Sequence, residues 1–72
     1  MQTIKLGRYR HFKGKEYQVI DIATDSESLR KMVVYRALYG EGGLWVRPLD
    51  MFCEVIERDG VCMPRFQLID IA

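Results

Sequence analysis

The stretch MVVYRALYGEGGLWVR, residues 32–47, decides the fold class of this chain. Residues 32–39 are mostly β-branched, aromatic or aliphatic, the types that pack well on a pleated strand. Glycines dominate residues 40–43, which favours a tight turn, and LWVR returns at residues 44–47. We therefore expect an antiparallel hairpin. Both faces of residues 32–39 are apolar, which is typical of a central strand or of a strand whose outer face binds a ligand.

A second hairpin is expected on the N-terminal side. Residues 8–12 and 16–23 alternate in the manner of strands, and Lys13 and Gly14 mark a turn between them. The apolar positions of the second segment change phase at Ile20, which predicts a β-bulge or a sharp bend. Bends of this kind help a small sheet to curve and close.

The C-terminal part contains a third hairpin signal. An Asp-Gly pair at residues 59–60, between strand-like residues 53–58 and 61–66, predicts a type I′ turn. In the register that this turn sets, Cys53 and Cys62 lie several residues apart along the ladder, beyond the reach of a disulfide. We expect both cysteines to be reduced, and we expect no metal site.

A short connection is expected where Pro48 interrupts the strand ladder, because proline has no N–H to donate. The segment PLDMF, residues 48–52, is predicted to form a single 3₁₀ turn with Leu49 and Phe52 on one side. The chain then counts five or six short strands with frequent turns, a pattern of small sandwiches and barrels. At this length a partly open β-barrel is the preferred all-β architecture.

Composition limits the classes of protein that the chain can be. It has 72 residues, a formal net charge of +1 and 49% hydrophobic residues, which predicts one domain over residues 1–72. This length excludes a two-domain enzyme and a doubly wound dinucleotide-binding fold. No apolar run approaches the roughly 18 residues of a membrane span, and the N-terminus does not read as a signal peptide. A cytoplasmic location and no membrane association are expected.

Several segments resemble a known family. YRHFKG at residues 9–14, VVYRALYG at 33–40, LWVRP at 44–48 and MF at 51–52 are similar to the hallmark segments of a short bacterial family. That family is catalogued as domain of unknown function 1653. The resemblance covers about residues 7–69. It implies an SH3-like small β-barrel and no established activity, substrate or cofactor.

A candidate anion site follows from the hairpin at residues 32–47. If GEGG alone forms its loop, Tyr39 faces Leu44 and Arg36 faces Arg47. Two arginines directly opposite one another repel, unless an anion lies between them. One reading is therefore an anion clamp, with Trp45 and Tyr39 as a stacking surface. The alternative is structural: the arginines bond internally to Asp50, Glu54 or a chain carbonyl, and Trp45 is the main core residue.

Charge is distributed unevenly along the chain. Residues 1–15 carry five cations and no acid, whereas residues 41–60 carry five acids and two arginines. A basic strand of this density can contact phosphates, but the cations can also pair with nearby acids. His11 is the only histidine, and a general base needs an orienting partner, for which Glu16 is the nearest candidate.

The function predicted from the sequence is a small non-catalytic binding module, without a cofactor. Its ligand is expected to be a protein or peptide with an anionic group. Three alternatives are single-stranded nucleic acid on the same surface, a homo-oligomer formed through residues 32–39 or the last hairpin, and an enzyme that uses His11. The residues predicted to bind the ligand are Tyr9, His11, Arg36, Tyr39, Trp45 and Arg47.

Overall fold

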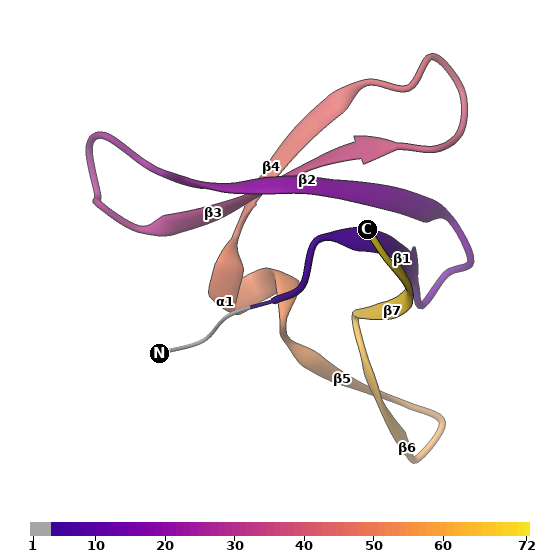
Figure 1. Cartoon of the computed structure of the whole chain (residues 1–72). Coiled ribbons are helices and arrows are strands. Elements are labelled where there is room, and N and C mark those ends of the chain that lie inside the picture. The colour runs from indigo at the N-terminus through magenta and orange to yellow at the C-terminus, as the bar shows by residue number, and fades with distance from the viewer. Residues whose placement is uncertain (1–3) are drawn as a thin grey trace.

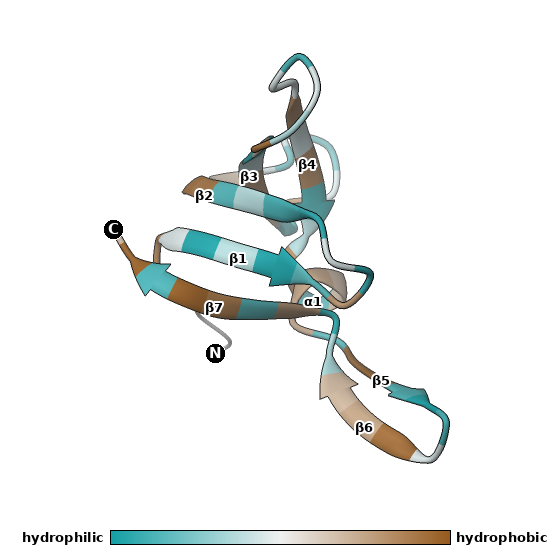
Figure 2. Ribbon diagram, turned by 90° about the vertical axis from the view of Figure 1, so that its right-hand side faces the viewer, coloured by the Kyte–Doolittle hydropathy of each residue, from teal (hydrophilic) through white to brown (hydrophobic). Residues whose placement is uncertain are grey.

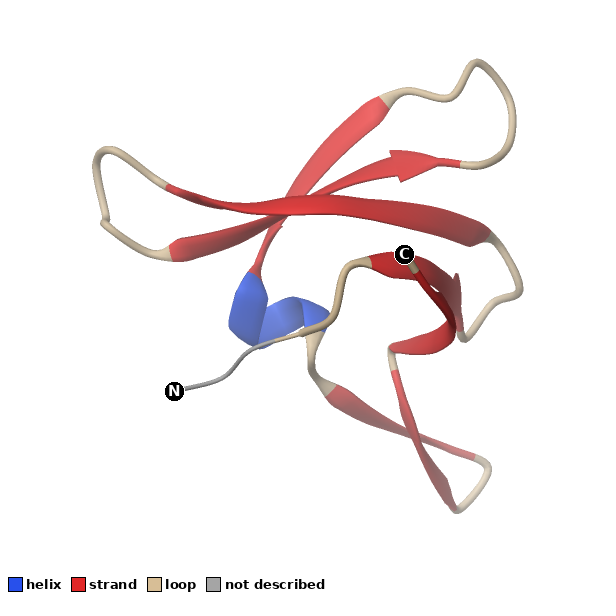
Figure 3. Cartoon of the chain, viewed as in Figure 1, coloured by secondary structure: helices blue, strands red, loops and turns tan. Residues whose placement is uncertain are grey.

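The computed structural model describes residues 4–72, which form seven strands and one short helix (Figures 1 and 3). Residues 1–3 of the expected single domain lie outside the described residues. The elements are β1 (Gly7–His11), β2 (Glu16–Thr24), β3 (Lys31–Ala37), β4 (Leu44–Pro48), α1 (Leu49–Phe52), β5 (Val55–Arg58), β6 (Val61–Pro64) and β7 (Phe66–Ile71).

The strands form two antiparallel sheets. The larger sheet has the order β4-β3-β2-β1-β7, and β5 pairs with β6 in a separate hairpin. The all-β class is confirmed, but described residues 4–72 hold seven strands, not five or six. Strands β4 and β7 are the two edges of the larger sheet.

The strand that the sequence analysis missed is β7. The chain leaves β6 at Pro64, and Arg65 then joins the two sheets through its backbone. Its N–H donates to the Glu54 carbonyl over 2.8 Å, and its carbonyl accepts the N–H of Phe12 over 2.9 Å. This arrangement turns the chain back so that Phe66 pairs with His11 and β7 runs along β1.

The predicted bulge in β2 is confirmed. The register between β2 and β3 shifts between Val19 and Asp21, which leaves Ile20 out of the ladder. Val19 pairs with Tyr35 on one side of the bulge, and Ile22 pairs with Val33 on the other. Because the extra residue restores the alternation, both Val19 and Ile22 contribute to the hydrophobic core.

The connection after β4 is a single α-helical turn, so the expectation of a 3₁₀ turn was wrong. The N–H of Cys53 donates to the Leu49 carbonyl over 3.0 Å, which is the i to i+4 bond of an α-helix. Leu49 and Phe52 are both buried on the same side, as predicted. Pro48 precedes the helix, where its missing N–H costs no hydrogen bond.

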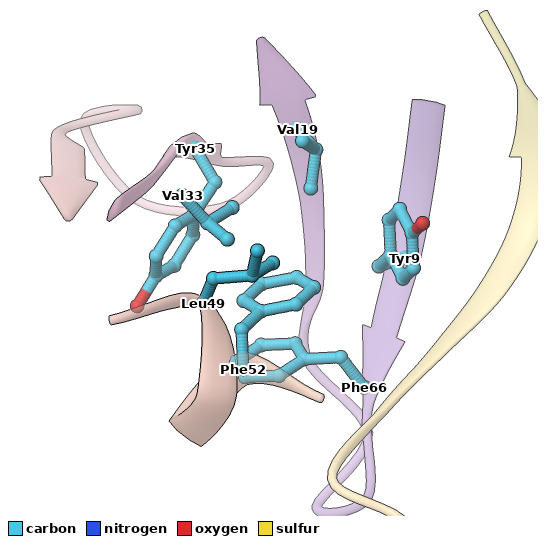
Figure 4. Close-up of a cluster of buried hydrophobic side chains, with 7 residues drawn as sticks. All are labelled: Tyr9, Val19, Val33, Tyr35, Leu49, Phe52 and Phe66. Atoms are coloured by element: carbon cyan, nitrogen blue, oxygen red, sulfur yellow. The ribbon is translucent and has the colours of Figure 1, made fainter. Parts of the chain in front are cut away.

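The hydrophobic core lies between α1 and one face of the five-stranded sheet, here called the inner face (Figure 4). The rings of Phe52 and Phe66 stack at 4.1 Å with an interplanar angle of 4°. Tyr9 meets the edge of Phe52 at 5.3 Å, and Tyr35 meets it at 5.6 Å. The buried cluster comprises Tyr9, Val19, Val33, Tyr35, Leu49, Phe52 and Phe66.

The β5–β6 hairpin has the predicted register. Arg58 pairs with Val61 and Glu57 with Cys62. Asp59 and Gly60 have φ angles of 53° and 77°, which a type I′ turn requires. Both cysteines are free, as expected. The hairpin projects away from the larger sheet (Figure 2).

Candidate binding surface

The register of the β3–β4 hairpin differs from the predicted one. Arg36 pairs with Leu44, Tyr35 with Trp45, and Val33 with Arg47. Strand β3 ends at Ala37, so Leu38 and Tyr39 join the glycines and the loop has six residues instead of four. Side chains alternate between faces along a strand. Arg36 therefore lies on the outer face and Arg47 on the inner face, so the predicted arginine clamp was wrong.

Arg36 has a structural contact within its own hairpin. Its Nη1 donates to the Gly42 carbonyl over 2.7 Å, which holds the glycine-rich loop against β3. The alternative reading, an internal bond to a chain carbonyl, is confirmed for this residue. Arg36 has no part in the surface described below.

Arg47 is held in place by aromatic groups. Its Nε donates to the Tyr35 hydroxyl over 3.3 Å, and its guanidinium carbon lies 5.5 Å from the centre of the Phe66 ring. The acids expected as alternatives are engaged elsewhere: Asp50 pairs with Arg30, and Glu54 pairs with Arg65. No carboxylate among residues 4–72 lies within 4.0 Å of the Arg47 guanidinium.

Trp45 is 56% exposed, so the expectation that it is the main core residue was wrong. Phe52, brought in by α1, occupies the centre of the core instead. The physical reason is position: β4 is an edge strand. Trp45 and Arg47 are two residues apart and thus share the inner face.

Tyr9 belongs to the core, and its expected place in the ligand surface was wrong. It is only 6% exposed, and its hydroxyl donates to the Lys5 carbonyl over 2.7 Å. Burial raises the pKa of Tyr9, and this hydrogen bond partly opposes the rise. Its ring packs against Phe52.

Tyr39 lies in the loop after β3, next to Tyr17 of β2. The sequence analysis did not select Tyr17. The hydroxyls of Tyr39 and Tyr17 are 2.8 Å apart, and their rings meet edge to face at 5.5 Å. Burial and the hydrogen bond to Tyr39 raise the pKa of Tyr17 to about 12. The ammonium group of Lys15 lies 4.8 Å from the Tyr39 ring centre, a favourable cation–π distance.

His11 is positioned by packing rather than by a carboxylate. Its Nδ1 accepts the backbone N–H of Lys13 over 3.1 Å, and its ring meets Phe66 at 4.9 Å. Burial lowers the pKa of His11, and the positive charges of Arg47, Arg65 and Lys13 lower it further. Its surroundings therefore favour the neutral form of the imidazole.

The proposed catalytic partner of His11 is occupied. The Glu16 carboxylate accepts from Arg8 at 3.2 Å and from Arg10 at 3.2 Å, and Arg8 also pairs with Asp70 at 2.6 Å. The His11–Glu16 pair expected for an enzyme is therefore absent from the bonded contacts of residues 4–72. Two of the five N-terminal cations are balanced by these acids on the outer face.

Five exposed or partly exposed side chains remain together on the inner face. Tyr35 and Phe66 contact three of them, Tyr17, Arg47 and His11. Tyr39 contacts Tyr17, and Trp45 lies opposite Tyr35 in the strand pairing. The period-2 pattern of residues 16–23 could have identified Tyr17 on this face, but only the register showed which partner it meets. We call the following set the aromatic–cationic surface: His11, Tyr17, Tyr39, Trp45 and Arg47.

Comparison with known proteins places the chain in a family. Residues 7–68 match the model described as "Protein of unknown function (DUF1653)". The chain belongs to this family. A crystal structure of a DUF1653 protein from Bordetella bronchiseptica is similar, with a TM-score of 0.89 and 31% identity, covering 100% of this chain and 95% of that one. No curated protein matches the sequence.

The DUF1653 membership confirms the family resemblance found from the sequence motifs. The matched residues include every member of the aromatic–cationic surface. In described residues 4–72, no helix could span a membrane, and no group of three or more His, Cys, Asp or Glu side chains could hold a metal ion.

Proposed function

We propose that this DUF1653 domain is a non-catalytic module that binds a carboxylate-bearing peptide segment at the aromatic–cationic surface. The observation that supports this proposal most directly is the environment of Arg47. Its guanidinium is oriented by the Tyr35 hydroxyl and the Phe66 ring, yet it has no carboxylate partner among residues 4–72. An oriented guanidinium is suited to a bidentate bond with a carboxylate.

Trp45 supplies the apolar part of the proposed contact. It is exposed, precedes Arg47 by two residues and shares the inner face with it. Tryptophan and arginine are enriched among the residues that dominate binding energy at protein interfaces. A tryptophan side chain has only two side-chain torsions, so it loses little conformational entropy when a partner covers it.

A peptide is favoured over single-stranded nucleic acid on the distribution of charge. Arg8 and Arg10 are balanced by Glu16 and Asp70, and the formal net charge of the chain is only +1. Affinity for nucleic acid depends mainly on unneutralised cations that contact phosphates. The inner face retains Arg47 with Lys13 and Lys15 nearby, which suits one anionic group better than an extended phosphate backbone.

We also infer that the five-stranded sheet is a partly open SH3-like barrel. Support comes from the bulge after Val19, which bends β2, and from α1, which covers the inner face between β3 and β7. In such a barrel the aromatic–cationic surface lies at the open end, beside the free edge of β4.

The test uses a phage-displayed library of random linear heptapeptides, selected on the immobilised whole domain. We expect enrichment of peptides that contain Asp or Glu, and loss of their binding by at least about tenfold in Arg47→Gln. Arg36→Gln is the matched control, because it removes the same charge from the outer face. Both variants are first checked by amide NMR spectra for a native fold.

Two results would contradict the proposed peptide binding. Failure to enrich any peptide, or equal binding by Arg47→Gln and the native domain, contradicts the proposal. An amide NMR titration with random eight-nucleotide RNA tests the alternative ligand, single-stranded nucleic acid. Shifts at Trp45 and Arg47 that disappear at about 0.3 M salt would replace the peptide by single-stranded nucleic acid.

A further inference from the structure

Strand β4 offers backbone hydrogen-bonding groups along a free edge. In an antiparallel pair, residues alternate between positions bonded to the partner and positions whose N–H and C=O point away. The N–H of Ala37 donates to the Gly43 carbonyl over 3.0 Å, so Ala37 and Gly43 are a hydrogen-bonded pair. Every second residue of β4, counted from Gly43, is then bonded to β3. Trp45 and Arg47 therefore bond to β3, and the backbone groups of Leu44 and Val46 point outward from the sheet.

The side chains along this edge are apolar and open to solvent. Leu44, Trp45 and Val46 are consecutive and are 56%, 56% and 61% exposed. Figure 2 shows this hydrophobic strand at the margin of the sheet. Proteins usually protect edge strands with charged residues, bulges or a covering segment. No other strand of residues 4–72 pairs with this edge.

From this edge we propose that the peptide docks as an additional antiparallel strand on β4, an inference that rests on the proposed function above. Its central residue exchanges two backbone hydrogen bonds with Val46. The residue on one side faces Arg47 and is acidic, and the residue on the other side faces Trp45 and is apolar. The predicted motif is therefore an acid, an apolar residue and a second apolar residue, in that order from the N-terminus.

Charge complementarity selects this occupant over a second copy of the chain. In an antiparallel self-pairing centred on Val46, Arg47 would face Trp45 of the second copy and would still have no carboxylate. A peptide with an acid at that position supplies one. Pro48 ends the ladder, because it has no N–H to donate at the next outward position. The added strand is therefore short, and its side chains provide much of the affinity.

The first experiment scans a selected heptapeptide with single N-methyl groups and measures binding through the fluorescence of Trp45, the only tryptophan. We expect an alternating pattern. Methylation of the residue opposite Val46 should weaken binding at least about tenfold, because its N–H bonds to β4. Methylation of either neighbour should have little effect, because those N–H groups point away from β4.

The second experiment blocks the edge of the protein. Val46→Pro removes only the outward N–H and leaves the bonds to β3, since these run through Trp45 and Arg47. Proline is tolerated at such edge positions. We expect Val46→Pro to lose peptide binding at least about tenfold. The matched control Val46→Ala, which keeps the N–H, should retain most of it.

The results distinguish failure of strand addition from failure of the proposed peptide-binding function. Binding that is equally sensitive to methylation at all positions, or unchanged in Val46→Pro, overturns strand addition and leaves the peptide-binding function intact. Failure to select any peptide contradicts both. Sedimentation of the free domain adds a further check: a dimer that Val46→Pro converts to a monomer would assign the edge to a second copy and overturn the inference.

Discussion

The two ends of the inner face are built from similar residues and have opposite exposures. Near α1, Val33 is fully buried and Phe52 is 2% exposed, whereas Trp45 on β4 is 56% exposed. The difference is not one of hydrophobicity. It arises because α1 packs over the first region together with the Phe66 side chain of β7, while β4 is an edge to which no other strand of residues 4–72 is added. Burial in this domain depends on what covers a strand.

The largest loss of stability is expected from a substitution in the buried region near α1, here called the covered end. Phe52→Ala removes the ring that stacks on Phe66 and contacts Tyr9 and Tyr35. Truncation of a buried phenylalanine costs about 3–5 kcal/mol in the free energy of unfolding, a large share of the stability of a small domain. Urea unfolding followed by circular dichroism measures it. A loss below about 1 kcal/mol would show that the core is not centred on Phe52.

A substitution at Gly7 tests how tightly β7 closes the covered end. Gly7 has a φ of 151°, and a Cβ atom there would collide with the backbone carbonyl of Asp70 on β7. Gly7→Ala should lower the free energy of unfolding by about 1–3 kcal/mol through backbone strain. Gly14→Ala is the comparison, because a Cβ there meets nothing within 4 Å although its φ is also positive. Equal losses would mean that the β1–β7 contact is not tight.

The exposed end should respond weakly to the same kind of truncation. Trp45→Ala removes an aromatic ring that is mostly in solvent, so we expect a stability loss of about 1 kcal/mol or less. Urea unfolding by circular dichroism again gives the value, since this variant has no tryptophan fluorescence. A loss as large as that of Phe52→Ala would erase the distinction between the two ends.

The smallest effect is a pH dependence where the two regions meet. The folded pKa of His11 is lowered from its ordinary value of 6.5 by burial and by the charges of Arg47, Arg65 and Lys13. The unfolded chain therefore binds a proton more readily, and this stability contribution is lost as pH falls below about 6.5. Melting temperatures at several pH values should decline less steeply below that point in His11→Asn. Identical slopes for both proteins would contradict the shift.

Local features were predictable from the sequence because they depend on neighbours along the chain. The Asp59–Gly60 turn fixed the register of its hairpin, and the phase change at Ile20 located the bulge. The predicted register of β3 and β4 was wrong by three residues: Tyr39 was expected opposite Leu44, where the structure has Arg36. The reason is that Leu38 and Tyr39 resemble strand residues. They leave the ladder where the Leu38 N–H donates to Glu16 and the glycine loop begins.

The candidate surface was predictable in composition and not in arrangement. Of the predicted residues, His11, Tyr39, Trp45 and Arg47 do lie on the aromatic–cationic surface, whereas Tyr9 is buried and Arg36 faces outward. Alternation along a strand shows which residues share a face. It does not show which face is covered, because that depends on segments distant in the chain, here α1 and β7.

The sequence by itself determined that this chain is all-β, which family it belongs to, and where its tight turn and its bulge lie. These are consequences of residue type and of contacts within a hairpin. The tertiary structure alone decided that Phe52 and not Trp45 fills the core, that Arg47 and not Arg36 has an aromatic support without a carboxylate, and that β4 keeps a free edge. The physical reason is that burial and strand order result from long-range packing. Phe52 of α1 and Phe66 of β7 stack over one part of the inner face, and the edge of β4 has no partner strand in residues 4–72.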